Sequence, residues 1–228
     1  MTTEILLSKL INGFGNTVLL FAITLLVSLP LGLLISFGSR SKFLPIKGFC
    51  RGLVWIIRGT PLMLQVLLIT CVAWYGFGIK NLEIMAFFGF EKMKTLLFAY
   101  ACIAFIINYA CYFSEIFRGA IEDVPKGQYE AGKVLGMTKG QIFKEIILFQ
   151  LVKKTLAPVS NEVITLVKDT ALASVAGVID LYTAAGGLVN EFVIISPLLY
   201  AAVFYLIFNG ALTLLFSYLE KKMSFYKE

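Results

Sequence analysis

Histidine is missing from this 228-residue sequence, and charged residues make up only 15% of it. Without histidine, the chain has no imidazole for a metal site or for acid–base catalysis. No Gly-x4-Gly-Lys-Ser/Thr phosphate-binding loop occurs, so any ATP hydrolysis linked to this protein must come from a partner. The cysteines also lack metal-binding or redox spacing, and we expect them to be small buried apolar residues: Cys50, Cys71, Cys102 and Cys111.

Apolar residues are abundant instead. They make up 59% of the sequence, and the mean hydropathy is +0.86, which is typical of a membrane protein rather than a soluble one. A bilayer-spanning helix needs about 20 largely apolar residues. We therefore expect an all-α integral membrane protein that forms a single domain, 1–228, with about five transmembrane helices at 18–37, 61–77 (preceded by the apolar residues 54–57), 95–113, 156–178 and 192–219.

Lysine and arginine are divided unevenly between the two sides that five spans would create. Fifteen of them fall on one side, whereas only Lys9, Lys80, Lys92 and Lys94 fall on the other. Cytoplasmic segments carry the excess of positive charge in membrane proteins. We therefore expect the N-terminus outside, and the C-terminus and the 118–154 segment in the cytoplasm. The net charge of +6 is explained by these membrane borders, so no nucleic-acid partner is expected.

The 118–154 segment is polar and contains signals for two short helices. Pro125 suits the first turn of a helix, and Gly136 suits a left-handed end. Thr138 and Gln141 match a capping box that opens a second helix, and Ile142 and Ile146 lie on one apolar face of it. A polar helical pair between two membrane spans indicates a surface that contacts a cytoplasmic partner.

The spacing over 130–148 resembles the EAA loop of permease subunits of ATP-binding-cassette (ABC) importers, Glu-Ala-Ala-x3-Gly-x9-Ile-x-Leu-Pro. Two positions depart from that pattern: Gly132 replaces an alanine, and Phe149 replaces the proline. Phenylalanine does not restrict the backbone as proline does, so the second helix is expected to run on toward Lys153 or to gain apolar surface at Phe149. In that family the loop docks on the ATPase. The resemblance implies that the coupling residues here are Glu130, Ala131, Gly132, Gly136, Ile146 and Leu148.

The resemblance extends over nearly the whole chain. Segments similar in order and spacing to polar amino-acid permeases of the histidine/glutamine/arginine type lie at 12–17, 58–62, 115–119, 125–131 and 161–170. It implies a type I importer fold in the bacterial cytoplasmic (inner) membrane. The implied partners are ABC ATPase subunits, a second permease subunit (identical or homologous) and an extracellular or periplasmic solute-binding protein. It further implies a polar amino acid as substrate, ATP and Mg²⁺ used by the ATPase, and no cofactor bound by this chain. Which amino acid is carried stays open.

Polar residues within the expected spans are candidates for a substrate pathway, because such residues are costly in a bilayer and usually functional. In the 156–178 segment, Glu162, Thr165 and Asp169 share one helical face. Asn161 and Lys168 lie with Thr165 on an adjoining face. A zwitterionic amino acid needs donors for its carboxylate and acceptors for its ammonium group, and these two faces offer both.

The third span adds further candidates, since Asn108, Tyr112 and Glu115 share a face by the same spacing. Gln65 follows Pro61 by about one turn. Glu115 has an alternative role, a structural ion pair with Arg118 at i,i+3. The expected substrate pathway is therefore Gln65, Asn108, Glu115, Glu162, Thr165, Lys168 and Asp169.

Two other classes of function stay open at this point. A secondary transporter or channel driven by an ion gradient would work without an ATPase, and it usually has more spans or an internal repeat, neither of which is visible here. An intramembrane enzyme would need a nucleophile–base set or a metal site, and no spacing in the sequence supports one. Copurification with an ATPase subunit discriminates among these classes.

Overall fold

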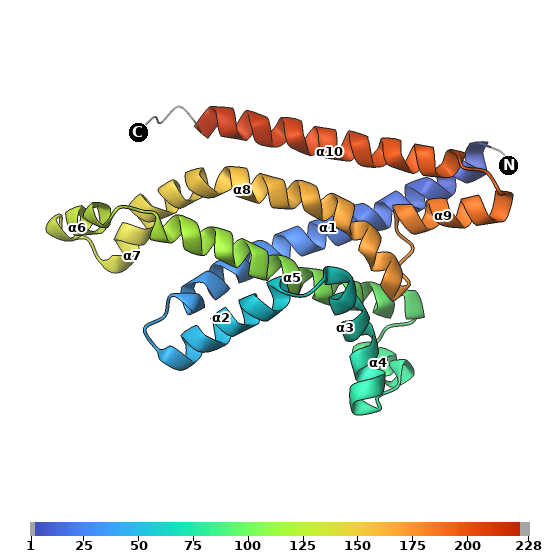
Figure 1. Cartoon of the computed structure of the whole chain (residues 1–228), viewed down its shortest axis with the longest axis horizontal. Coiled ribbons are helices and arrows are strands. Elements are labelled where there is room, and N and C mark those ends of the chain that lie inside the picture. Colours follow the sequence, from blue (N-terminus) through green and yellow to red (C-terminus); the bar gives the residue numbers. More distant parts are fainter. Residues whose placement is uncertain (1–2, 224–228) are drawn as a thin grey trace.

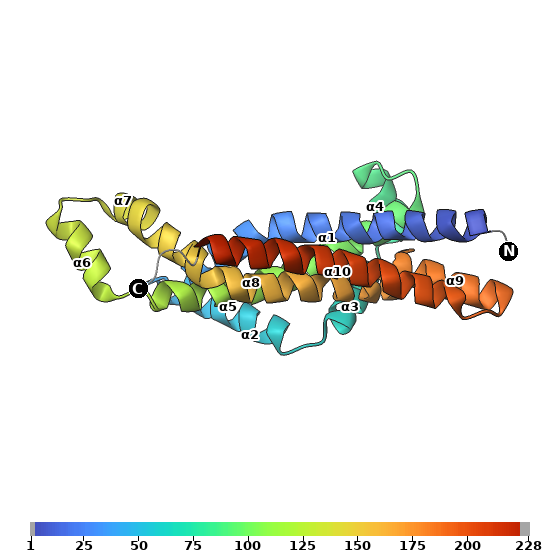
Figure 2. The same ribbon diagram turned by 90° about the horizontal axis from the view of Figure 1, so that it is seen from above.

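The computed structural model of this chain describes residues 3–223, apart from the side chains of Thr3, Ala73 and Trp74. Within that range every regular element is a helix, as expected for an all-α membrane protein. The long helices run along an elongated bundle, and α1 begins at the end opposite to the one where α10 finishes (Figures 1 and 2).

Five helical units are long and apolar enough to cross a bilayer, if each bent pair counts as one span. Three are single helices: α1 (Thr3–Ser39), α5 (Met93–Glu122) and α10 (Ser196–Met223). One bent pair joins α2 (Leu44–Arg58) to α3 (Leu62–Phe77) at 108°. The other joins the helical stretch that ends at Ala176 to α9 (Leu181–Phe192) at 58°. This agrees with the number expected from the sequence.

The second span is broken in the middle, whereas the sequence analysis placed a single helix at 61–77. The helix α2 ends at Arg58 and α3 begins at Leu62, so the preceding apolar residues belong to a separate helix. Pro61 explains the break, because proline lacks an N–H donor and moves the residue before it away from helical backbone angles. Figure 1 shows the break beside the middle of α5.

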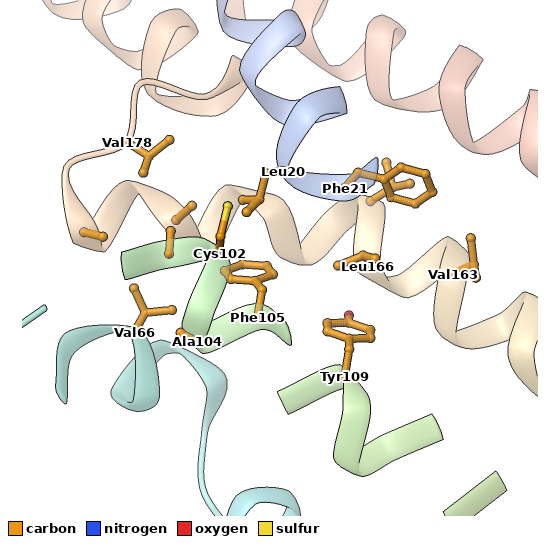
Figure 3. Packing of buried hydrophobic residues seen from close by; sticks show 14 of the residues in the cluster. Leu20, Phe21, Val66, Cys102, Ala104, Phe105, Tyr109, Val163, Leu166 and Val178 are labelled. Atoms are coloured by element: carbon orange, nitrogen blue, oxygen red, sulfur yellow. The ribbon is translucent and has the colours of Figure 1, made fainter. Parts of the chain in front are cut away.

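The core of the bundle is built around α5. Figure 3 shows Phe105 and Tyr109 of α5 in one cluster with Leu20 of α1, Val66 of α3 and Leu166 of α8 (Leu148–Asp169). Small polar side chains let membrane helices approach each other closely. On α1 the buried residues of this kind are Thr17, Thr24, Ser28, Ser36 and Ser39.

One continuous helix leads from the polar loop into the core. The helix α7 (Lys139–Gln141) passes directly into a π-helical stretch (Ile142–Ile147), then into α8 and a 3-10 stretch (Thr170–Ala176). The expectation of a short second loop helix is therefore wrong, and its alternative, a helix that runs on past Phe149, is confirmed. Without proline at this position, no backbone restriction stops the helix.

The two ends of the bundle carry different short helices. The helices α6 (Lys126–Val134) and α7 protrude at the end where α10 finishes (Figures 1 and 2). The helices α4 (Asn81–Phe88) and α9 lie toward the opposite end. The two faces of the membrane would therefore be next to different helices, α6 and α7 on one side and α4 and α9 on the other.

Candidate functional site

A cavity of about 250 Å³ lies inside the bundle, where the α2–α3 break meets α5 and α8. Pro61 creates this space indirectly, because the helical break leaves the walls of α5 and α8 uncovered at that level. Four of the expected pathway residues line this single cavity: Asn108 on α5 and, on one face of α8 as their spacing predicts, Glu162, Thr165 and Asp169. The full lining is Thr60, Pro61, Leu62, Asn108, Tyr109, Tyr112, Glu162, Thr165 and Asp169.

Hydrogen bonds connect the walls of this central cavity. The hydroxyl of Tyr109 on α5 donates to Oδ2 of Asp169 on α8 at 2.7 Å. The Nδ2 of Asn108 donates to Oε1 of Gln65 at 3.0 Å, which joins α5 to α3. Gln65 is buried, and its Nε2 donates to the carbonyl of Ile57 at 2.7 Å. Gln65 therefore fixes the break between α2 and α3 and supports the cavity from behind.

The other expected pathway residues lie outside the central cavity. Lys168 and Asn161 are exposed, and neither is among the lining residues. Glu115, one turn beyond Tyr112 on α5, lines a different cavity. Glu162 and Asp169 thus place two carboxyl groups in the central cavity, and its lining in the described part of the chain includes no lysine or arginine.

A second cavity of about 480 Å³ lies between α2 and α5, and three arginines line it together with Glu115. Arg118 holds Glu115 through two hydrogen bonds, from Nε to Oε1 at 2.9 Å and from Nη2 to Oε2 at 2.8 Å. The predicted ion pair is therefore present. The Nη1 of Arg58 lies 3.6 Å from the same carboxylate, and its guanidinium stands 5.1 Å from the ring centroid of Tyr112. Arg51 donates from Nε to the carbonyl of Ser39 at 3.2 Å. We call this cavity the arginine cavity.

The loop helix α6 ends as the sequence predicts but begins one residue later. Pro125 precedes the helix with φ −56° and ψ 135°, which is not helical. At the other end, the N–H of Met137 donates to the carbonyl of Gly132 at 3.0 Å, and the N–H of Gly136 to that of Lys133 at 3.0 Å. These two bonds form a Schellman motif, and the φ of 72° at Gly136 is the left-handed conformation that glycine adopts without strain.

The next helix opens with the predicted capping box. The hydroxyl oxygen of Thr138 accepts from the N–H of Gln141 at 3.3 Å, and the side-chain oxygen of Gln141 accepts from the N–H of Thr138 at 2.8 Å. Each residue therefore satisfies a backbone donor of the other. The turn between α6 and α7 is thus fixed at both of its ends.

The surface of α6 differs from the prediction at Gly132. This residue is buried, and a Cβ added to it would lie 2.6 Å from Cγ1 of Ile142. Glycine therefore lets α6 pack against the helix that follows it, instead of admitting a partner. Glu130, Ala131 and Gly136 are exposed, so this part of the expected coupling surface is accessible.

Two further expected coupling residues, Ile146 and Leu148, are partly buried. Ile146 packs on the loop's own apolar cluster. In contrast, Val134 and Leu135 have exposed fractions of 87% and 77%, and the sequence analysis did not select them. Their signal was two adjacent apolar residues at the end of an otherwise polar helix.

Residues around the central cavity were missed as well. Tyr109 and Thr60 line it, and Arg58 lies on the ring of Tyr112. In the sequence, the 58–62 segment carries a family resemblance but no pathway prediction. The signal that could have identified Arg58 is its position as the last charged residue before an uncharged span.

A third cavity, of about 910 Å³, lies between α1, α5 and α9, at the end of the bundle opposite to α6 and α7. Lys9 and Glu191 line it and form an ion pair at 2.6 Å. Asn16 donates from Nδ2 to the carbonyl of Ile179 at 2.8 Å across its wall. This end is therefore a polar surface as well.

The sequence is similar to known proteins over most of its length. The family described as "Binding-protein-dependent transport system inner membrane component" matches residues 28–225. The chain is 31% identical to the putative glutamine transport system permease protein GlnP of Rickettsia conorii, over 94% of this chain and 92% of that protein. It is 30% identical to the arginine transport system permease protein ArtQ of Bacillus subtilis, with the same coverage of each.

The solved structures include a similar chain. A chain from the crystal structure of an amino acid ABC transporter with histidines superposes on this one with a TM-score of 0.77 and 29% sequence identity. The similarity covers 94% of each chain. The likeness therefore extends over nearly the whole chain.

Proposed function

Since the chain belongs to the family of binding-protein-dependent transport system inner membrane components and has the type I ABC importer permease fold, we propose that it carries a polar L-α-amino acid through the membrane. Its relatives are permease subunits named for glutamine and arginine. The observation that carries the proposal is the match to the family over residues 28–225. The alternative of a gradient-driven secondary transporter has no support from the comparisons.

The central cavity is the proposed substrate site. Glu162 and Asp169 supply acceptors for an ammonium group, and Asn108 and Thr165 supply hydrogen bonds that orient the ligand. Unpaired charges are expensive away from water, so a zwitterion needs such partners wherever it is held inside the bundle. Substrate would leave this site toward the end of the bundle that carries α6 and α7.

The exposed part of α6 is the proposed coupling surface. Glu130 and Ala131 lie on it, and Gly136 ends it. The uneven distribution of lysine and arginine supports placing this end in the cytoplasm, with the N-terminus outside. A cytoplasmic ATPase would then contact α6 and act on α8 through the continuous helix.

The remaining partners follow from the family. We infer a complex with a second permease subunit, ABC ATPase subunits and a solute-binding protein on the outer face. ATP and Mg²⁺ would be used by the ATPase, because this sequence lacks a phosphate-binding loop, and this chain itself would bind no cofactor.

Reconstitution tests the proposal directly. The chain is produced with its candidate ATPase and solute-binding protein, placed in liposomes, and supplied with labelled L-glutamine, L-arginine or L-cystine. The expected result is ATP-dependent uptake of at least one of them, which disappears when the ATPase lacks its phosphate-binding lysine. Uptake driven by an ion gradient without ATPase would instead indicate a secondary transporter, and calorimetry on the solute-binding protein identifies the ligand independently.

A further inference from the structure

The central cavity lacks one of the groups that an amino acid requires. Two carboxyl groups, Glu162 and Asp169, line it, and among its described lining residues none is cationic. An amino acid held there would have partners for its ammonium group, whereas its own carboxylate would lie near two others. A cation from outside the lining is needed to compensate that charge.

Arg58 is in position to supply this cation. Its guanidinium lies over the ring of Tyr112, which itself lines the cavity. Thr60 and Pro61, two and three residues further along the chain, are also in the lining. Arg58 therefore stands at the boundary between the central cavity and the arginine cavity.

The other arginines nearby are held by different groups. Arg118 is bound to both oxygens of Glu115 and, through Nη1, to Glu122 at 2.7 Å. Arg51 points its Nε to the carbonyl of Ser39. Neither lines the central cavity.

The contact between Arg58 and Glu115 is loose by comparison. Its distance of 3.6 Å exceeds that of a charge-assisted hydrogen bond, about 2.7–2.9 Å. Because Arg118 already satisfies both oxygens of Glu115, Arg58 can leave this carboxylate without stranding it. The guanidinium is a planar fork that matches a carboxylate through two parallel hydrogen bonds.

We propose that Arg58 is the carboxylate-binding residue of the transport site, and that it exchanges its contact with Glu115 for the α-carboxylate of the substrate. This inference rests on the proposed function, since it assumes that an amino acid occupies the central cavity. Arg58 is also the last residue of α2. Movement of its side chain toward the ligand therefore acts at the break between α2 and α3.

The test measures direct binding to the purified permease–ATPase complex, without the solute-binding protein, which recognises the ligand by itself. L-arginine is compared with agmatine, and L-glutamine with 4-aminobutanamide, so each amino acid is matched with the amine that lacks its carboxylate. The expected wild-type result is that at least one amino acid binds about 10- to 100-fold more tightly than its amine, the size of a charge-assisted hydrogen-bond contribution.

Four variants separate the possibilities. In Arg58→Gln the preference for the amino acid over its amine should fall to about twofold or less, while the affinity for the amine is kept. Arg58→Lys should retain part of this preference. Arg51→Gln removes an arginine of the same helix from the same arginine cavity, and it should leave the preference intact. Glu115→Gln should keep or raise the preference, because it removes the competing carboxylate.

The outcomes have distinct meanings. A preference that survives in Arg58→Gln overturns the assignment and leaves the proposed function standing. Loss of the preference in both Glu115→Gln and Arg58→Gln overturns it as well, since the pair would then be needed as a structural unit. If the wild-type complex transports none of the amino acids in liposomes, the proposed function fails and this inference fails with it. If Arg58→Gln does not assemble, Arg58→Lys decides, because an undiminished preference there contradicts a bidentate contact.

Discussion

Tyr109 and Asp169 come from different helices, and the hydroxyl of Tyr109 donates a 2.7 Å hydrogen bond to the carboxyl group of Asp169. Tyr109 is almost fully buried in the core around α5. Asp169 is the last residue of α8 before the helix tightens into its 3-10 stretch. The bond therefore fixes an acidic side chain of the proposed transport site against the most deeply packed helix.

Changing Tyr109→Phe removes this hydrogen bond without changing the shape of the core. Hydrogen bonds to charged groups contribute about 1.5–3 kcal/mol, so we expect lower thermal stability and weaker amino-acid binding, as Asp169 loses its fixed position.

Asp169→Asn should reduce substrate-dependent uptake more strongly and leave basal ATP hydrolysis intact. Uptake by liposomes, ATPase activity and the unfolding temperature of the complex are measured together.

Tyr100→Phe is the matched control for Tyr109→Phe. It lies on the same helix and loses a hydroxyl bond to Oδ1 of Asn81 at 3.2 Å, away from the central cavity. It should lower stability without changing substrate affinity. Normal uptake in Asp169→Asn would remove this residue from the transport site.

Gly136→Val should separate the coupling loop from the ATPase. The left-handed conformation at φ 72° costs a residue with a side chain about 1–2 kcal/mol, and a β-branched residue fits it worst. We expect the chain to insert and fold, while copurification with the ATPase and transport both fall. Gly140→Val, in the same loop but with no positive φ and no atom close to an added Cβ, serves as the control, and full transport by Gly136→Val would contradict the docking assignment.

Gly132→Ala should destabilise the loop, although alanine is the residue of the family pattern. The added methyl group would lie 2.6 Å from Ile142, which is itself buried, and overpacking of this kind costs about 1–3 kcal/mol. Hydrogen exchange of peptides from 126–148 should rise in this variant. The second change Ile142→Ala should relieve the clash, and Gly127→Ala, where an added Cβ meets no atom within 4 Å, should not raise the exchange, because alanine favours the helix more than glycine does.

A cysteine at position 139 tests the orientation of the chain. Lys139 begins the helix that follows the capping box, and we expect Lys139→Cys to react with an impermeant thiol reagent only after the cells are opened. Lys92→Cys, beside the start of α5 at the other end of the bundle, should react in intact cells. The native cysteines are replaced by serine first, and labelling of position 139 from outside would reverse the topology.

Much of this architecture could be predicted from the sequence, because bilayer spans and helix caps depend on local composition. The shared face of Glu162, Thr165 and Asp169 followed from helical periodicity alone. The partners of these residues depend on how separate helices pack, and no local pattern encodes that. Tyr109 belongs to α5 and Arg58 to α2, so the bond of Tyr109 to Asp169 and the contact of Arg58 with the ring of Tyr112 became visible only in the folded chain. Lys168 was expected in the pathway from its sequence position but lies outside it. Its neighbour Asp169 lines the cavity, whereas Lys168 is exposed.

The helix that runs without a break from Lys139 to Ala176 also has a mechanical consequence. About 30 residues separate its start from Asp169, which corresponds to ~45 Å at 1.5 Å per residue. If this stretch turned as one body about its middle by about 5°, each end would move by ~2 Å in opposite directions, with no loop between the two ends. A push on the loop by a bound partner would therefore arrive at the ligand's acidic contacts as a sideways shift, comparable to the difference between a made and a broken hydrogen bond.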